Sequence, residues 1–399
     1  MSGWDQRAVF EEVDWQAVGH ERSLPPAEVL TLILGGLLLA SFYAYVKLFT
    51  HGYIIDDWRM GRLQWVFLLG WLSIISFGVV PALKRWSTTK RYLRYLLSRP
   101  VTAFSLIFVA ILVFVGLFGP VLMQSPGLRF DFEYTPPVGF TTEISPFRCG
   151  GTRIGEAFDS ICQGTWDHPL GTNHRGHPIE YLLMTGARIT MYVVVFTAGF
   201  IVPIAVATGI IAGLRGGWVD SALMSYVDIQ LSLPAIIVYF VGYMYWNVSL
   251  LLLLVTFGLL SWGGIARLVR SEVLQRREEG HVMVARGLGA SEAYVAVRHI
   301  LPNVSNTVLP AMFHLLAMLV LIEAGIAFLG FHEIGVFSWG STIAESVNSV
   351  YSPGLLSAER NIPTTDIWWA STFPALVLAL TMFSFKVLGD GLRDAMDRR

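Results

Sequence analysis

Five residues in one polar stretch of the chain have side chains that could form a covalent link or hold a metal ion: Cys149, Cys162, His168, His174 and His177. Thiolates and imidazoles are the usual ligands of zinc, whereas two cysteines can instead join in a disulfide. The chain has 2 cysteines, too few for a tetrahedral all-cysteine metal site. The stretch is rich in Pro and Gly and has no regular helix to bring the histidines together. Its residues therefore favour a disulfide, with a metal site as the alternative.

No other group of residues has the spacing of a catalytic centre. The phosphate-binding pattern Gly-x-x-x-x-Gly-Lys-Ser/Thr and the metalloprotease pattern His-Glu-x-x-His are both absent. His314 is the only histidine deep in an apolar run, and no Ser or Asp is spaced to form a nucleophilic pair with it. We therefore expect a chain that is not an enzyme and binds no cofactor, so that any ATP and Mg²⁺ must bind other polypeptides.

The composition is that of a membrane protein. Hydrophobic residues make up 54% of the 399 positions and charged residues 14%, with a mean hydropathy of +0.57. A soluble protein carries about 25% charged residues. The formal charge is −1, which removes nucleic acid as an obvious partner.

Runs without Asp, Glu, Lys or Arg locate the membrane spans. These runs are Val29–Val46, Leu63–Leu83, Pro100–Leu128, Ile189–Leu214, Ile229–Ala266, His299–Ile322 and Ile367–Phe385. A helix needs about 20 apolar residues to cross the hydrocarbon layer, so the 38 residues of the fifth run are too long for one crossing. We expect that run to break near Asn247-Val248-Ser249 into helices around 222–245 and 249–267. The sequence therefore predicts an all-α polytopic protein with about eight transmembrane helices.

Basic residues predict the orientation of these spans. The segment between spans two and three is rich in Lys and Arg, as is the segment between spans six and seven and the tail after the last span. These residues are Lys84, Arg85, Lys90, Arg91, Arg94, Arg99, Arg267, Arg270, Arg276, Arg277, Arg286, Arg298, Lys386, Arg393, Arg398 and Arg399. The positive-inside rule then makes both loops and both termini cytoplasmic, in the cell membrane. No cleavable signal peptide is expected, because the first 28 residues are of mixed charge.

Two long segments, 125–184 and 330–366, are then external. Cys149 and Cys162 lie in the first, on the oxidising side, where a disulfide is the natural interpretation. Two acidic residues lie within predicted spans, Asp228 and Glu323. They could form a polar patch along a substrate path, or make hydrogen bonds between helices.

The segment from Glu272 to Asn303 is predicted to form two short helices. Gly289 suits the left-handed backbone position that ends the first helix, and Ser291 can cap the second. Pro302 is expected to interrupt the helix just before span seven. The mixture of Arg, Glu and small apolar residues is typical of a helix at the membrane surface with one face docked on another protein. An ordinary connecting loop is the alternative.

Four blocks of sequence carry a resemblance to a known family. In this segment they are Val282-Met-Val-Ala-Arg-Gly-Leu-Gly-Ala-Ser291 and Arg298-His-Ile-Leu-Pro-Asn303. Elsewhere they are His168-Pro-Leu-Gly-Thr172 with Gly186-Ala-Arg-Ile-Thr190, Glu323-Ala-Gly-Ile-Ala-Phe-Leu-Gly330 with Ser338-Trp-Gly-Ser341, and Trp368-Trp-Ala-Ser-Thr-Phe-Pro374 running to Leu388-Gly-Asp-Gly-Leu-Arg-Asp-Ala-Met-Asp397. The first block resembles the EAA loop of ABC-importer permeases, and all four resemble the dipeptide, oligopeptide and nickel permease family in the same order.

The resemblance implies a function and a set of partners. Such a permease forms half of a translocation pathway for peptides, or for nickel or oligosaccharides. It works with a second permease subunit, two ATP-binding subunits and an external solute-binding protein in the lipid bilayer. A stand-alone secondary transporter is the alternative from another class, although neither repeated halves nor paired acidic residues at mid-depth are present.

The same resemblance assigns candidate residues and domains. The ATPase-coupling loop, 268–303, would act through Glu279, Met283, Val284, Ala285, Gly289, Ala290, Ser291, Leu301 and Pro302. Residues 101–399 would form the six-helix core of a type I importer permease, and residues 1–100 an extension with two extra spans and a basic linker.

Two departures from the family pattern stand out. Met283-Val284-Ala285 replaces Glu-Ala-Ala, so the contacts of that glutamate are absent or come from Glu278 or Glu279. Gly176-His177-Pro178 replaces the usual Gly-Arg-Asp, which puts a salt-bridged turn there in doubt.

Overall fold

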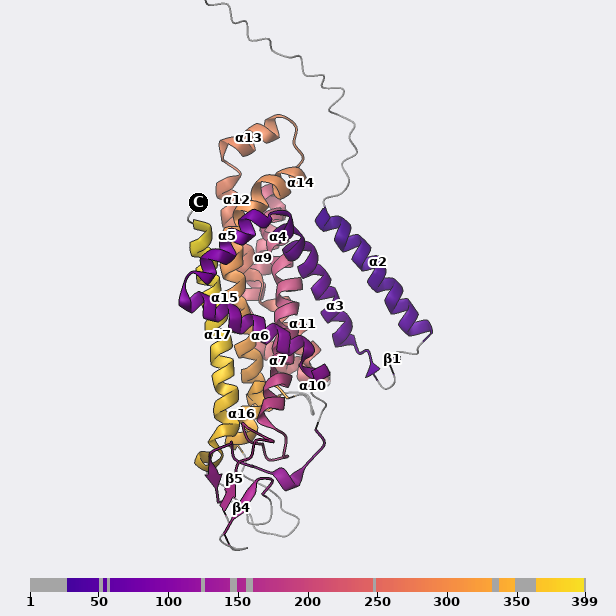
Figure 1. The fold of residues 1–399 in the computed structure, drawn as a ribbon. Helices are drawn as coiled ribbons and strands as arrows, with labels where there is room; N and C mark the ends of the chain where they lie inside the picture. Colours follow the sequence, from indigo (N-terminus) through magenta and orange to yellow (C-terminus); the bar gives the residue numbers. More distant parts are fainter. Residues whose placement is uncertain are drawn as a thin grey trace, which may run out of the picture.

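The computed structural model describes residues 27–49, 53–55, 58–122, 126–143, 149–155, 161–246, 249–331, 337–348 and 364–397. Seven helical segments in this part of the chain are long and apolar enough to cross a membrane, and counting one bent pair of helices as a further span gives up to eight. Most of them lie side by side in an elongated bundle (Figure 1). The prediction of an all-α polytopic protein is therefore confirmed.

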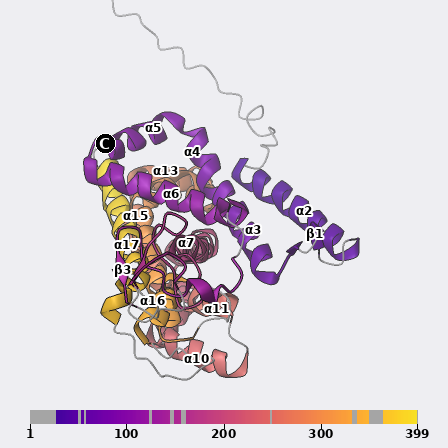
Figure 2. The same ribbon diagram turned by 60° about the horizontal axis from the view of Figure 1, so that its bottom comes forward.

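The first two spans form a pair at the edge of the bundle. Helix α2 (Ala27–Leu48) is joined to α3 (Arg62–Ile74) through the short antiparallel strands β1 (Tyr53–Ile55) and β2 (Trp58–Arg59). A π-helical turn, η1 (Ile75–Val79), continues α3 into α4 (Val80–Lys84). Helix α3 packs on the core through Gly70, whose backbone lies directly against Gly199. Helix α2 packs on α3, η1 and α4 and stands apart from the rest of the bundle (Figure 2).

The central bundle is built from the remaining spans. After α5 (Trp86–Leu97) come α6 (Pro100–Leu122), α7 (Ile179–Phe196), the π-helical turn η3 (Thr197–Ile201) and α8 (Val202–Arg215). They are followed by α9 (Gly217–Ser232), α10 (Ala235–Tyr245), α11 (Leu250–Leu260) and α12 (Gly263–Arg276). The last two spans are α15 (Leu301–Phe328) and α17 (Trp368–Asp397).

Small residues allow the central helices to approach closely, as is common between membrane helices. A Cβ atom on Gly209 would lie 2.6 Å from the carbonyl oxygen of Ala266, and one on Gly213 would lie 2.7 Å from the side chain of Val273. Helices α8 and α12 are therefore in backbone contact over two turns.

The two ends of the bundle differ. One end carries α5, the end of α12, the short helices α13 (Gly280–Gly287) and α14 (Glu292–Val295), and the C-terminal end of α17 (Figure 1). The other end carries α16 (Trp339–Asn348) and a sheet of strand order β3-β5-β4, made of Thr141–Thr142, Ile161–Gln163 and Thr152–Ile154. The short 3-10 helices η2 (Phe130–Phe132) and η5 (Thr364–Ile367) complete the loops there. Both basic loops thus share one end, as the charge pattern predicts.

The fifth span is bent rather than straight. Helices α9 and α10 meet at 76° across Leu233 and Pro234. Leu233 is extended, with φ −86° and ψ 122°, because the ring of a following proline excludes the helical conformation. The predicted break after span five falls partly on residues 247–248, which lie outside the described residues. Residues 1–26 of the predicted extension, 349–363 of the predicted second long loop, and Arg398 and Arg399 of the tail also lie outside them.

Two helices run farther than expected. Helix α12 continues to Arg276, so the first residues of the predicted loop 268–303 are helical. Pro302 does not interrupt the chain, because Glu292–Phe328 forms one continuous helical segment. The π-helical turn η4 (Ala296–Ile300) lies directly before α15 and widens the backbone where Pro302 cannot donate a hydrogen bond. Pro203 follows the π-helical turn η3 in the same way.

Candidate functional site

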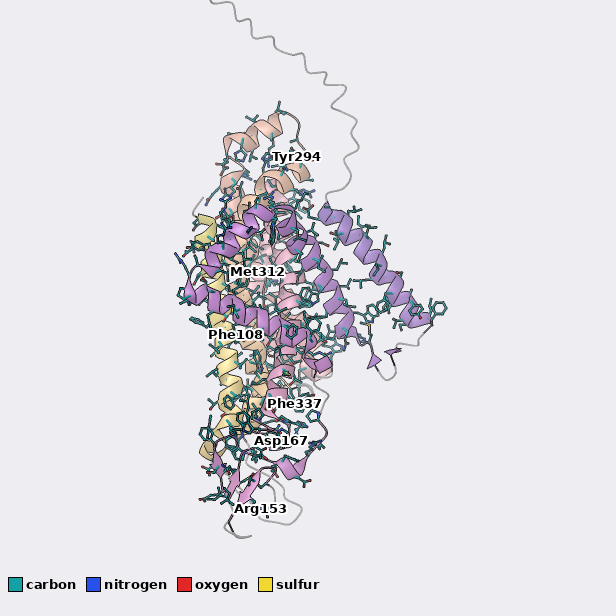
Figure 3. All side chains as sticks on the ribbon, viewed as in Figure 1. Phe108, Arg153, Asp167, Tyr294, Met312 and Phe337 are labelled. Atoms are coloured by element: carbon teal, nitrogen blue, oxygen red, sulfur yellow. A yellow bond between two sulfur atoms is a disulfide. The ribbon has the colours of Figure 1, made fainter. Side chains whose placement is uncertain are left out.

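The loop between α12 and α15 forms a small projecting unit at one end of the molecule. After Arg276 the chain turns, forms α13, turns again at Leu288 to Ala290, and enters α14. Figure 3 shows Tyr294 at this end and Arg153 at the opposite one. We call residues 277–295 the α13 loop.

Local rules explain the sharp turn after α13. Gly289 has φ +89°, in the left-handed region that favours glycine. Its N–H donates to the carbonyl of Arg286 at 2.9 Å, and the N–H of Ala290 donates to the carbonyl of Ala285 at 3.0 Å. This is the hydrogen-bond pattern of a Schellman motif. The Ser291 hydroxyl accepts from the Tyr294 N–H at 3.2 Å. The predicted helix end and helix cap are both confirmed.

The α13 loop is anchored by two side chains and exposes several others. Val282 and Val295 are fully buried in the main core. Apolar side chains beside them point outward: Met283, Val284, Leu288, Tyr294 and, one turn into η4, Val297. Leu288 is 83% exposed. A cluster of exposed apolar side chains on a projecting loop is typical of a protein–protein contact.

Ion pairs hold the start of the α13 loop and connect its last helix, α14, to the bundle. Glu279 lies 3.5 Å from both Arg276 and His281, and Arg276 also pairs with Glu272 at 3.4 Å. Glu292 lies 3.4 Å from Arg215 of α8. Glu279 therefore braces the loop from within.

The structure groups most of the predicted loop residues but not all of them. Met283, Val284 and Ala285 lie on α13, and Gly289, Ala290 and Ser291 form the turn that follows. Leu301 and Pro302 lie farther along, at the start of α15, with Leu301 partly exposed.

The two acidic residues of the predicted spans lie in different surroundings. Glu323 is buried where α15 meets α16 and makes a hydrogen bond with Ser338. Asp228 is exposed on α9 and pairs with Arg267 of α12. The two carboxylates are not brought together, and Glu323 takes part in helix packing.

Helices α9 and α12 share a second ion pair that the sequence analysis missed. Arg270 donates two hydrogen bonds to the carboxylate of Asp220, and this pair is more buried than Asp228–Arg267. The available signal was the presence of two acidic residues on helix α9 of the fifth span and two arginines on helix α12 of the next span.

Tight contacts join four separate parts of the sequence at the opposite end. The Trp339 indole donates to the Leu183 carbonyl at 3.0 Å and covers Gly186, where a Cβ atom would lie 2.2 Å from its ring. Gly340 lies against the Ala324 carbonyl of α15. The Trp369 indole donates to the Thr172 carbonyl at 3.1 Å. These contacts tie the loops at this end to the core.

The turn at Gly176 is held by an asparagine. The Asn173 side-chain oxygen accepts from the N–H groups of Arg175 at 3.0 Å and His177 at 2.9 Å, and Gly176 has φ +71°. Arg175 pairs with Glu345 of α16 at 3.3 Å. An ion pair is therefore present at this turn, but it joins Arg175 to another helix, α16, and lies outside the Gly176-His177-Pro178 sequence itself.

The three histidines of this region have separate partners. His168 lies 3.8 Å from Glu180, His174 lies 3.6 Å from Glu345, and the His177 ring packs on Phe337. Burial and the nearby Arg175 lower the pKa of His174 to about 4, so its ring is neutral at neutral pH. Burial raises the pKa of Glu345, against the effect of Arg175. Within the described residues no three metal-ligating side chains converge.

Cys149 and Cys162 are joined by a disulfide that ties the entrance of the small sheet to β5. We predict that a Cys149→Ser/Cys162→Ser double variant loses about 3 kcal/mol of stability in this unit, since the bond closes a loop between residues 13 apart. Limited proteolysis should then cleave residues 126–163 faster, with no change at the α13 loop. Reductant should reproduce the effect in the parent chain and do nothing to the variant; equal cleavage rates throughout would contradict the prediction.

Comparisons with known proteins identify the architecture. Residues 205–399 match the family described as "Binding-protein-dependent transport system inner membrane component". The dipeptide transport system permease protein DppC of Bacillus subtilis (strain 168) is 31% identical over 232 residues, 58% of this chain and 68% of its own. The oligopeptide transport system permease proteins OppC of B. subtilis (strain 168) and Escherichia coli (strain K12) are 30% identical over 236 and 232 residues, each 58% of this chain and 72% of theirs. The chain belongs to this permease family.

It is a membrane-spanning permease subunit of an ABC importer, as the sequence blocks indicated. Permeases of this kind work, in general, with a partner permease, an ATPase and a binding protein. The four sequence blocks coincide with the contacts above: one forms the α13 loop, and the others supply the Trp339, Gly340 and Trp369 contacts.

The half-buried ion pair Asp220–Arg270 gives a testable difference from the exposed pair Asp228–Arg267. Asp220→Asn is expected to lower the stability by about 2 kcal/mol, because it leaves Arg270 half-buried without its carboxylate. Asp228→Asn is the matched control and should change stability by less than about 1 kcal/mol, since its pair is exposed. Thermal unfolding of the purified complex measures both, and equal effects would show that burial does not distinguish the pairs.

Proposed function

We propose that this chain forms half of the translocation pathway of an ATP-driven importer and receives the movement of a cytoplasmic ATPase through the α13 loop. The observation that carries the proposal is the projecting α13 loop, anchored by Val282 and Val295 while Met283, Val284 and Leu288 are exposed. A groove on an ATP-binding subunit would cover these apolar side chains.

The connection from the loop to the bundle supports a mechanical role. Helix α12 enters the loop and also packs along α8, and α14 leads without a break into α15. A push on α13 therefore acts on two spans at once. Rigid-body switching of this kind needs a packing with two stable arrangements, which ATP binding on a partner can bias.

The proposed assembly has two different permease subunits, two ATP-binding subunits with their ATP and Mg²⁺, and an external solute-binding protein. Both termini and the α13 loop would lie on the cytoplasmic side of the cell membrane, because the basic segments gather at that end. The proposed division is an extension over residues 1–100 and a permease domain over 101–399.

Peptides are the proposed cargo, because the curated relatives are named as dipeptide and oligopeptide permeases. The binding protein would select the peptide, while this chain supplies part of the path.

The test is affinity purification of the tagged chain in mild detergent, with identification of the proteins that co-elute. We expect a second polytopic permease and proteins with phosphate-binding loops in stoichiometric amounts, and peptide uptake once the complex is reconstituted with its binding protein. A chain that elutes alone as an oligomer of itself would contradict the proposed assembly. Uptake of nickel or an oligosaccharide instead of peptide would contradict only the cargo.

A further inference from the structure

Helix α5 is an amphipathic helix that connects two candidate membrane spans. One residue separates it from α4, and two separate it from α6, so both of its ends are tied to membrane spans. It crosses the end of the bundle that also carries the α13 loop (Figures 1 and 2). A helix with such short connections lies at the depth where the spans leave the hydrocarbon.

One face of α5 is already used for packing. Leu96 is buried against Gly391 of α17, and its carbonyl accepts from the Thr102 hydroxyl of α6. Arg99, just after the helix, pairs with Asp394 of α17 at 2.9 Å. These contacts fix which sides of α5 face outward.

A second face of α5 is apolar and exposed. Trp86, Leu93 and Leu97 are spaced seven and four residues apart, which places them on one side of a helix. Their exposed fractions are 54%, 39% and 50%. Tryptophan is enriched at membrane–water interfaces, so this face has the composition of one that enters the acyl region.

Basic residues border this apolar face: Lys90 lies four residues after Trp86, at its edge, and Arg91 and Arg94 lie farther round the helix. Lys90, Arg91 and Arg94 are exposed, and none of them has an acidic partner among the residues that the structure describes. Nearby exposed arginines differ in this respect, since Arg215 pairs with Glu292 and Arg393 with Asp397. Three unpaired positive charges beside an apolar stripe are complementary to anionic headgroups above acyl chains.

We propose that α5 binds anionic phospholipids of the leaflet on the α13 side, with Lys90, Arg91 and Arg94 on the headgroup phosphates and Trp86, Leu93 and Leu97 in the acyl region. Because α5 is also packed on α17 and α6, this contact would hold the second and third spans at a fixed depth. The proposal depends only on the membrane-spanning architecture and is independent of the cargo and of the α13 loop.

The test uses the full-length protein in its assembled complex. Both cysteines of this chain are in the disulfide, so Leu97→Cys gives this chain a single free thiol, which is labelled with an environment-sensitive fluorophore before assembly with the partner subunits. The complex is placed in nanodiscs that contain a lipid with brominated acyl chains, with or without phosphatidylglycerol. Ser98→Cys is the matched control, because it is exposed one residue away on a different side of the helix.

We expect strong bromine quenching at Leu97→Cys, weak quenching at Ser98→Cys, and a clear increase at Leu97→Cys with phosphatidylglycerol. Lys90→Gln/Arg91→Gln/Arg94→Gln should lower the affinity for phosphatidylglycerol at least about tenfold and remove that increase. Arg215→Gln/Arg393→Gln should leave it unchanged. Absence of quenching at Leu97→Cys would show that a protein covers this face and would overturn the proposal. Equal quenching with and without phosphatidylglycerol, in the protein that retains Lys90, Arg91 and Arg94, would also overturn it.

Discussion

Gly289→Val is expected to abolish ATP-coupled transport while the complex still assembles. The backbone at Gly289 has φ +89°, and nothing lies within 4 Å of a Cβ atom placed there. Valine in this left-handed conformation therefore costs about 2 kcal/mol of backbone strain, and the strain is relieved if the turn between α13 and α14 opens. Opening the turn moves Met283, Val284 and Leu288 away from the proposed ATPase groove. Uptake into proteoliposomes and ATP hydrolysis measured on the same sample would show hydrolysis without transport.

Two variants separate this explanation from general damage to the loop. Gly289→Asn should keep most of the transport, since asparagine tolerates the left-handed conformation. Gly287→Ala should be neutral, because a Cβ atom there also meets open space and the residue is helical. Normal transport by an assembled Gly289→Val complex would contradict the role given to this turn.

Gly340→Ala is expected to destabilise the end of the permease that carries α16 by about 3 kcal/mol and to reduce transport below about a tenth of the normal rate. A Cβ atom at this position would lie 1.9 Å from the carbonyl oxygen of Ala324 and 2.6 Å from its carbon. Both are backbone atoms, so the clash is relieved only if α16 moves away from α15. That movement would also lift Trp339 off Gly186 and change the setting of α15, which is continuous with α14 and the α13 loop.

Gly325→Ala, next to the contacted residue on α15, is the matched control. Nothing lies within 4 Å of a Cβ atom there, and alanine favours helix more than glycine, so stability should stay equal or rise slightly. Thermal unfolding and uptake assays on both variants check the prediction. A Gly340→Ala protein with unchanged stability would show that the contact with Ala324 is less tight than described.

Features governed by short-range rules could be predicted from the sequence. Charge-free runs marked the spans, because hydrocarbon excludes charge from any exposed helix face. The turn at Gly289 and the helix cap at Ser291 could be predicted, since each depends on hydrogen bonds to a residue three positions away. The basic segments could be placed at one end because eight crossings alternate in direction.

Features governed by contacts between distant residues could not be predicted. Pro234 indicates that the helix bends near Leu233, but the size of the bend, 76°, depends on how α10 packs on the rest of the bundle. The Asp220–Arg270 pair joins residues 50 positions apart in the sequence. The contact of Gly340 with Ala324 of α15 forms only because the chain after α15 folds back onto the bundle. Pro302 was misjudged because a π-helical turn can absorb a missing hydrogen bond without ending a helix.

Photo-crosslinking from the α13 loop tests the central claim most directly. A photoreactive group at Leu288→Cys in the assembled complex should form an adduct with the ATP-binding subunit. The same group at Trp166→Cys is the matched control, because both side chains are 83% exposed and Trp166 lies near the disulfide, at the end of the bundle opposite the α13 loop. We expect an adduct with the ATP-binding subunit from Leu288→Cys and none from Trp166→Cys. An intact complex that gives no such adduct from Leu288→Cys, or gives it from Trp166→Cys, would contradict that claim.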